Sequence, residues 1–204
     1  MAQRRFFCVL ASVGALWMGA VLVTWAMGSG MEPLVRSSAR RSAVVPATAL
    51  CLLALFVATG LSGLRTERSL KWSGGVSSAV LLIAMGYVVF DILGQPQPDH
   101  VLFRDKLAPG DRMSMGTSLG LVLGAFVTRL SAEGKRNFLA LTLSLLGVSV
   151  AVTVLLCNCF VPGSPFSIPP LQGMSVYTAA AFTMLFPNVL LVLDAEHFAL
   201  LAED

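Results

Sequence analysis

Six apolar runs, each about as long as a bilayer is thick, constrain this chain more than any other feature. They cover about residues 6–28, 44–64, 74–94, 113–130, 137–160 and 174–193. A helix needs about 20 apolar residues to cross the hydrocarbon core. Because lipid offers no hydrogen-bond partner to a backbone amide, each run must satisfy its own amides as a helix. The sequence therefore predicts an all-α integral membrane protein with six transmembrane helices in a single membrane domain, residues 1–204.

The composition excludes an ordinary water-soluble globule. Charged residues make up 12% of the chain and hydrophobic residues 56%, whereas soluble domains carry about 25% charged residues. The net charge is +3, and the basic residues lie between the apolar runs rather than in a long tract. That distribution argues against nucleic acid as a partner. The expected partners are the lipid bilayer and other membrane proteins, including further copies of this chain.

The first apolar run follows MAQRR, as the core of a signal peptide would, but it exceeds 20 residues and contains two tryptophans. A cleavable leader usually has an apolar core of about 7–15 residues. We therefore interpret this run as the first membrane helix.

The basic residues also orient the chain, because Lys and Arg near span ends favour the cytoplasmic side. With the N-terminus inside, eight basic residues lie on the inner side and six on the outer side. The cluster of Arg36, Arg40 and Arg41 opposes this orientation. The short basic loop at 131–137 and the uncharged fifth loop favour it. We expect both termini in the cytoplasm, with a short tail at 194–204.

An internal repeat links the second, fourth and sixth runs. They open as VVPATAL, MSMGTSL and MSVYTAA, which places Thr48, Thr117 and Thr178 at equivalent positions. The offset of 61 from Thr117 to Thr178 also carries Gly86 onto Gly147 in the preceding runs. Repetition at a fixed offset indicates duplication of one supersecondary unit. The simplest architecture is three helical hairpins in series, with the recurrent glycines as sites of close helix packing.

The shared openings have a local physical explanation. Ser114 and Ser175 are placed to accept hydrogen bonds from first-turn amides, and Pro46 needs no such partner near the first helical position. Each threonine, one turn further in, can bond a carbonyl or a neighbouring helix. Helix initiation is the favoured interpretation, and a ligand-facing role for the three threonines is the alternative.

The repeated opening, a Met or Val, a Pro or small residue, then T-A-L and a Leu-rich run, resembles the six-helix membrane sensor regions of bacterial histidine kinases and GGDEF-type diguanylate cyclases. The resemblance covers most of the chain and implies a location in the bacterial inner membrane. In that family a signalling module follows the last span. The tail LLVLDAEHFALLAED keeps apolar residues at helical spacing, as a signalling helix or a frayed amphipathic end would.

No enzymatic activity is expected, because the chain has no phosphoacceptor histidine box, nucleotide-binding motif or GGDEF sequence. We assign no catalytic residue, no metal site and no cofactor. Cys157 and Cys159 point to different helix faces at a spacing of two residues. With His100 they form no recognisable ligand pattern. No lysine lies within a span to form a Schiff base, and no histidine lies there to bind haem.

Three further residues are candidates for function. Asp91 lies near the end of the third run, and an ionisable group in a membrane is a functional hypothesis by default. An interfacial ion pair with Arg104 or Arg112 is favoured over a proton relay. Pro187, beside Asn188 in the sixth run, removes one backbone hydrogen bond and kinks the helix. A static bend is favoured over a hinge.

The leading functional hypothesis is a non-enzymatic sensor or docking module that binds an apolar ligand or a partner membrane protein between hairpins. The alternative is an accessory structural subunit of a larger membrane complex. A small-solute transporter would carry broken helices and polar groups at the midplane. Apart from Pro187 and Asn188, the sequence shows little of that.

Overall fold

A computed structural model describes residues 2–27, 35, 43–103, 107, 111–133, 137–160 and 173–201. Within these ranges, side chains are described except at 2–5, 7, 137, 158–160 and 194–201. Several predictions above concern parts that lie outside the described residues: Arg36, Arg40, Arg41, Arg104, residues 134–136, residues 161–172 of the fifth loop, the side chain of Cys159 and the side chains of the tail from 194.

The described elements are all helices, and six of them are long and apolar enough to cross a membrane. They are α1 (Ala2–Met27), α3 (Pro46–Leu64), α4 (Glu67–Ile92), α6 (Met115–Glu133), α7 (Asn137–Phe160) and α8 (Val176–Leu201). The prediction of an all-α, multi-pass membrane protein is confirmed.

Two details differ from the prediction. Helix α4 begins at Glu67, about seven residues before the predicted apolar run, because the polar residues there form a capped first turn. Thr66 and Ser69 make reciprocal side-chain to backbone bonds, and Lys71 pairs with Glu67 at 2.7 Å. In addition, a short helix, α5 (Pro98–Leu102), lies in the loop between α4 and α6. It was not predicted.

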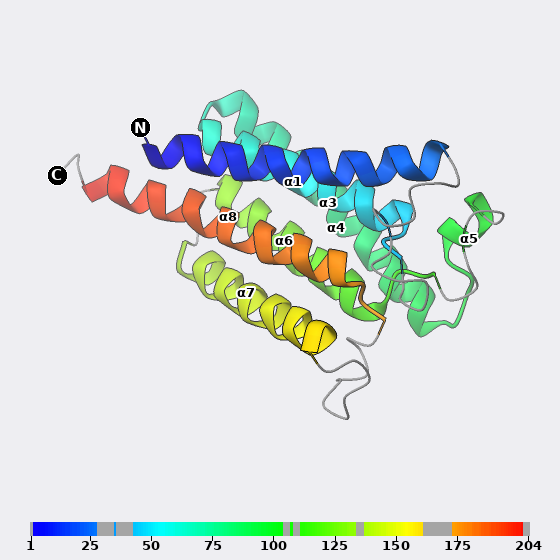
Figure 1. The fold of residues 1–204 in the computed structure, drawn as a ribbon. Coiled ribbons are helices and arrows are strands. Elements are labelled where there is room, and N and C mark those ends of the chain that lie inside the picture. Colours follow the sequence, from blue (N-terminus) through cyan, green and yellow to red (C-terminus); the bar gives the residue numbers. More distant parts are fainter. Residues whose placement is uncertain are drawn as a thin grey trace.

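Consecutive long helices pair as three hairpins, α1 with α3, α4 with α6, and α7 with α8. The two termini consequently lie at one end of the bundle, and α5 lies at the other (Figure 1). We refer to these as the terminal end and the α5 end. Helices α3, α6 and α8 all begin at the α5 end, so they run parallel to one another.

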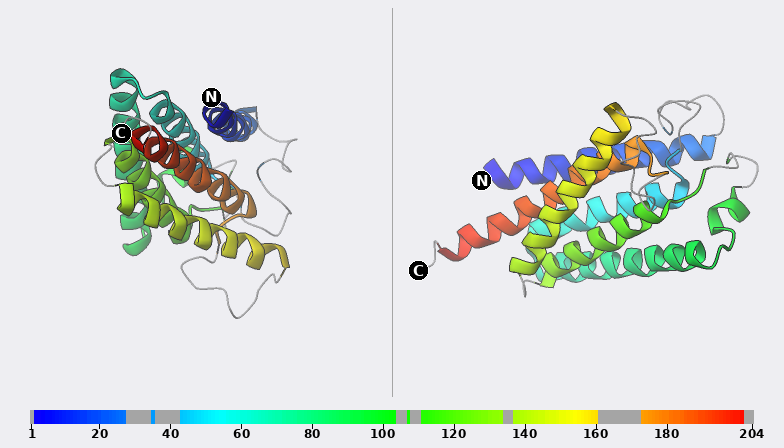
Figure 2. Two further views of the ribbon diagram at one scale, coloured as in Figure 1. Left: turned by 90° about the vertical axis from the view of Figure 1, so that its left-hand side faces the viewer. Right: turned by 90° about the horizontal axis from the view of Figure 1, so that it is seen from below.

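The hairpins form a ring with three inner and three outer helices. In α3, α6 and α8, 56% of the membrane span is buried, against 33%, 22% and 28% in α1, α4 and α7. The inner helices contact one another, and each outer helix packs against the inner helix of its own hairpin and of the preceding one. Helix α1 takes its second neighbour from the last hairpin, α8, so the ring closes (Figure 2).

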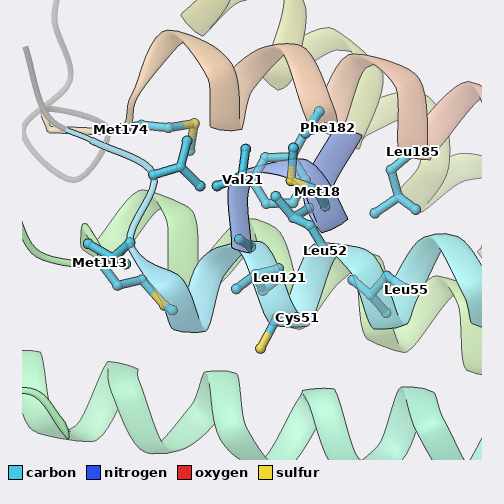
Figure 3. Packing of buried hydrophobic residues seen from close by; sticks show 14 of the residues in the cluster. Met18, Val21, Cys51, Leu52, Leu55, Met113, Leu121, Met174, Phe182 and Leu185 are labelled. Atoms are coloured by element: carbon cyan, nitrogen blue, oxygen red, sulfur yellow. The ribbon is translucent and has the colours of Figure 1, made fainter. Parts of the chain in front are cut away.

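The core of the ring follows the repeat. Thr48, Thr117 and Thr178 are all buried at the start of the inner helices. Two turns further along, Leu55, Gly124 and Leu185 occupy equivalent positions, and a Cβ on Gly124 would lie 3.3 Å from Leu55 and 3.1 Å from Leu185. These contacts show that the repeat places equivalent residues in shared layers. Met18 and Val21 of α1 pack into the same core (Figure 3).

The glycines inside the apolar runs, most of which are predicted to allow close packing, differ in how close their neighbours lie. A Cβ on Gly14, Gly120 or Gly147 would lie less than 3 Å from a phenylalanine ring of the neighbouring inner helix. Gly19 and Gly86, by contrast, have no atom within 4 Å of such a Cβ, so they do not mark close packing among the described residues. The offset of 61 that carries Gly86 onto Gly147 also carries Ala125 of α6 onto Phe186 of α8. Gly86 therefore has a small side chain where Gly147 has a ring.

Candidate functional site

An apolar groove with a cavity of about 200 Å³ lies between α6 and α7. One wall includes Gly116, Gly120 and Leu123 of α6, and the other includes Leu146 and Val150 of α7. The groove therefore lies at the boundary between the second and third hairpins.

The floor of the groove is aromatic. Phe182 and Phe186 of α8 line it and stack on each other, with ring centroids 5.8 Å apart and an interplanar angle of 26°. Gly120 and Gly147 allow these rings to approach the backbones of α6 and α7, since an added Cβ would lie 2.7 Å and 2.6 Å from them. Helix α7 crosses α8 obliquely (Figure 2). Small wall residues and an oblique wall leave space above the two rings.

The side chains at the rim of the groove face outward as well as inward. Leu119 is 43% exposed, Leu146 is 52% exposed and Val150 is 39% exposed. All three lie within membrane spans, where the surrounding medium is lipid. The groove is thus open sideways toward hydrocarbon and offers almost no polar atom to a ligand. Its chemistry suits an apolar molecule that arrives through the bilayer.

A second, polar site lies at the α5 end and centres on Asp99. This carboxyl is 2% exposed although it belongs to a loop helix. Its Oδ1 atom accepts from the amide of Ala47 at 3.2 Å, and its Oδ2 atom lies 3.0 Å from the hydroxyl of Tyr87. Since Pro46 has no N–H, the Ala47 amide is the first free donor of α3. Asp99 therefore caps one helix and contacts another.

Burial raises the pKa of Asp99 above its usual range. The hydrogen bond from Tyr87, the amide of Ala47 and the charge of His100 each lower it, but desolvation is the largest effect. Removal of water penalises the charged form of a carboxyl group, which accounts for the direction.

Two more buried side chains fix the same loop. Gln97 donates to the carbonyl of Met113 and accepts from the amide of Met113, both at 2.8 Å. Asp111 accepts from the amide of Ala43 at 3.2 Å. With Asp99, they connect the α4–α6 loop to the starts of α3 and α6. Sequence analysis missed all three residues.

The predicted caps at the inner helices are present. The amide of Thr117 donates to Ser114 Oγ at 3.2 Å, and the amide of Thr178 donates to Ser175 Oγ at 3.0 Å. The hydroxyls of Thr117 and Thr178 also bond the same two serines. They do not line the groove, so these contacts support helix initiation as their role. Thr48 is buried at the corresponding position of α3.

Asp91 forms the ion pair expected from its position. Its Oδ1 atom lies 4.0 Å from the guanidinium of Arg112, whose side chain is 68% exposed. A pair so long and so exposed contributes little to stability. It lies apart from the groove, which Asp91 does not line.

Pro187 lies inside α8, and Asn188 beside it is fully buried. Neither polar atom of the Asn188 amide has a hydrogen-bond partner within the part of the chain that the structure describes. The two residues follow the groove floor directly, because Phe186 precedes Pro187.

Cys157 and His100, considered above as metal ligands, are both partly buried and belong to different helices, α7 and α5. Among the described residues, no group of three His, Cys, Asp or Glu side chains is arranged to hold a metal ion.

Comparisons with family models, with curated proteins and with solved structures gave no match for this chain.

Proposed function

We propose that this protein is a non-enzymatic membrane module that binds one apolar chain in the groove between α6 and α7. The observation that carries the proposal is the cavity of about 200 Å³ above Phe182 and Phe186. Apolar protein cavities of about 150 Å³ stay dry and accept a molecule the size of benzene. A slightly larger groove, open to lipid, fits a segment of an acyl or isoprenoid chain.

The size of the groove argues against a partner helix as its occupant. A helix with its side chains is about 10–12 Å across and buries a long stripe of surface. A single side chain or a single hydrocarbon chain is the largest object that the cavity accommodates. Enclosed ligand sites for larger molecules measure about 300–1,000 Å³.

Helix α8 connects the groove to the end of the bundle where the chain leaves the membrane, so it can transmit the binding of an occupant. The helix carries both floor rings and continues without a break from its membrane span, which ends at Leu193, to Leu201. Eight further residues extend a helix by about 12 Å. An occupant that shifts Phe182 or Phe186 would therefore displace a rod that leaves the bilayer. This is the sensor aspect of the proposal.

The proposed setting follows from the sequence. The resemblance to the membrane sensor regions of bacterial kinases and cyclases supports the bacterial inner membrane. The distribution of basic residues supports cytoplasmic termini. In that orientation, the α5 end of the bundle faces the outside. The groove opens toward the outer half of the bilayer, because two of its lining residues, Gly116 and Met174, adjoin the starts of α6 and α8 at that end.

The proposal is tested with a phospholipid that carries a photoactivatable diazirine in its acyl chain. The full-length protein is reconstituted with this lipid in nanodiscs, irradiated and mapped by mass spectrometry. We expect the labels to concentrate on the groove walls, at Leu119, Leu123 and Leu146. Equal labelling of the outer faces of α1, α4 and α7 would contradict a specific site.

Two valines on α7 provide a matched pair of variants. Val150 lines the groove and is 39% exposed, whereas Val152 does not line it and is 38% exposed. Val150→Trp fills the cavity and should lower wall labelling several-fold, while Val152→Trp should leave it unchanged. An equal effect of both variants would refute the groove as the binding site.

Native gel electrophoresis after mild extraction separates this function from that of an accessory subunit. Migration as a monomer or small oligomer supports a lone module. Co-migration with a large complex would favour the structural role instead.

A further inference from the structure

The buried carboxyl of Asp99, at the α5 end of the bundle, does not line the groove. From its contacts we infer that Asp99 is a proton-binding site that fastens α5, the described helix of the α4–α6 loop, over the start of α3 when protonated and loosens it when ionised. This inference is independent of the apolar ligand proposed above.

The geometry suits a neutral carboxylic acid. The Oδ1 atom accepts from the Ala47 amide at 3.2 Å, a bond that a protonated carboxyl makes as well as an ionised one. The Oδ2 atom lies 3.0 Å from the Tyr87 hydroxyl, which can accept a hydrogen bond from the acid or donate one to the anion. Both contacts therefore survive protonation, and only the charge disappears.

The described neighbours of Asp99 are mostly neutral groups. Helix α4 presents Tyr87 to the carboxyl, helix α3 presents Cys51, and α5 itself presents His100. Cys51 points from α3 toward α4 (Figure 3). Among the described residues, no arginine or lysine pairs with Asp99. A carboxylate with two neutral donors and 2% exposure has lost most of its hydration, and none of the described side chains forms an ion pair with it.

The direction of the effect follows from linkage. Burial raises the pKa of Asp99 in the closed loop, whereas an open, hydrated Asp99 titrates in its ordinary range. The closed loop therefore binds the proton more tightly than the open loop, so protonation favours closure. As the pH rises through the raised pKa, the closed loop must accommodate a charge, and opening becomes easier.

Opening would expose the backbone that Asp99 caps. The Ala47 amide donates to Asp99, and its hydrogen can exchange with solvent when this contact breaks. An internal control exists in the first turn of α8, where the Thr178 amide, one residue past the equivalent of Ala47, donates to the hydroxyl of Ser175. A serine hydroxyl does not titrate in this pH range.

The test is hydrogen exchange of the full-length protein in nanodiscs between about pH 5 and pH 8, corrected for the intrinsic pH dependence of exchange. For the wild-type protein, we expect protection of residues 44–50 and 97–103 to fall several-fold as the pH rises, with residues 175–179 unchanged. For Asp99→Asn, which is neutral at every pH and keeps one acceptor and one donor, we expect no such fall.

Flat protection in the wild-type protein, or an equal fall in Asp99→Asn, would overturn the inference. Tyr87→Phe provides a second test that retains the aspartate. Because it removes one of two donors to the anion, protection at pH 8 should fall further than in the wild-type protein. Protection equal to wild type at that pH would also count against the inference.

Discussion

The ring of Phe186 occupies the space in which a side chain on Gly147 would begin. An ideal Cβ at Gly147 would lie 2.6 Å from this ring, which is closer than real carbon atoms approach. The repeat places Gly86 at the equivalent position of the second hairpin, where nothing lies within 4 Å. Equivalent glycines therefore differ in what they do.

We expect Gly147→Ala to destabilise the protein by about 1–3 kcal/mol, because overpacking a close helix contact forces ring or backbone to move. The measurement is thermal unfolding in detergent, followed by tryptophan fluorescence. The matched control is Gly86→Ala, which should be neutral or stabilising by up to about 1 kcal/mol, since alanine favours a helix over glycine. Equal effects of the two substitutions would contradict the packing described.

Gln97→Ala should destabilise the α5 end. Its side chain satisfies both backbone groups of Met113, which is 1% exposed. Each buried polar group left without a partner costs about 1–3 kcal/mol. Gln97→Glu would place a carboxylate beside the carbonyl of Met113 at a position that is 4% exposed, so it should destabilise the protein at least as much as Gln97→Ala at neutral pH. Gln95→Ala, at an exposed site two residues earlier, should change the unfolding free energy by less than about 0.5 kcal/mol. A silent Gln97→Ala would show that the loop is not held in this way.

Asp99 should make global stability depend on pH. Its pKa is raised in the folded state, so the folded protein binds more protons than the unfolded chain between the ordinary and the raised value. The contribution of Asp99 is therefore most favourable at low pH and declines as the pH rises through that window. Asp99→Asn should flatten this part of the pH profile and raise the melting temperature at pH 8.

Asp91→Asn is the control for that profile, because the exposed pair of Asp91 with Arg112 contributes little. If wild type and Asp99→Asn showed parallel pH profiles, another group would be responsible for the dependence.

Asn188→Leu should stabilise the protein by about 1–3 kcal/mol, because it removes a buried amide whose two polar atoms have no described partner. Ser131→Ala, which removes from α6 a buried hydroxyl with no partner among the described residues, should act in the same direction with a smaller gain. Loss of stability in Asn188→Leu would show that this amide does make a hydrogen bond. Chemical unfolding in mixed micelles provides the comparison.

Local patterns predicted much of this fold. Run length and hydropathy predicted six helices, and the serines before α6 and α8 predicted caps that lie within three residues of their partners. These features depend on neighbours in the sequence. The ion pair of Asp91 with Arg112 was also within reach, since both residues flank one loop.

The sites themselves were out of reach because they depend on distant partners. Asp99 bonds a backbone amide 52 residues away, and Asp111 bonds one 68 residues away. Neither side chain belongs to a motif, and the short Pro-rich loop that holds Asp99 reads as a connection. The groove depends on which glycines face a phenylalanine on another helix, and the repeat alone does not distinguish Gly147 from Gly86.

The packing of α1 against α8 has a consequence for the order of assembly. The first hairpin emerges from the ribosome with one flank of α1 facing lipid, and that flank stays uncovered until the sixth span has been made. The α4–α6 hairpin, in contrast, gains its neighbours from the hairpins made just before and just after it, so its flanks face lipid for a shorter time. The contact between α1, the first span to be made, and α8, the sixth, is therefore the last helix contact of the ring to form during biosynthesis.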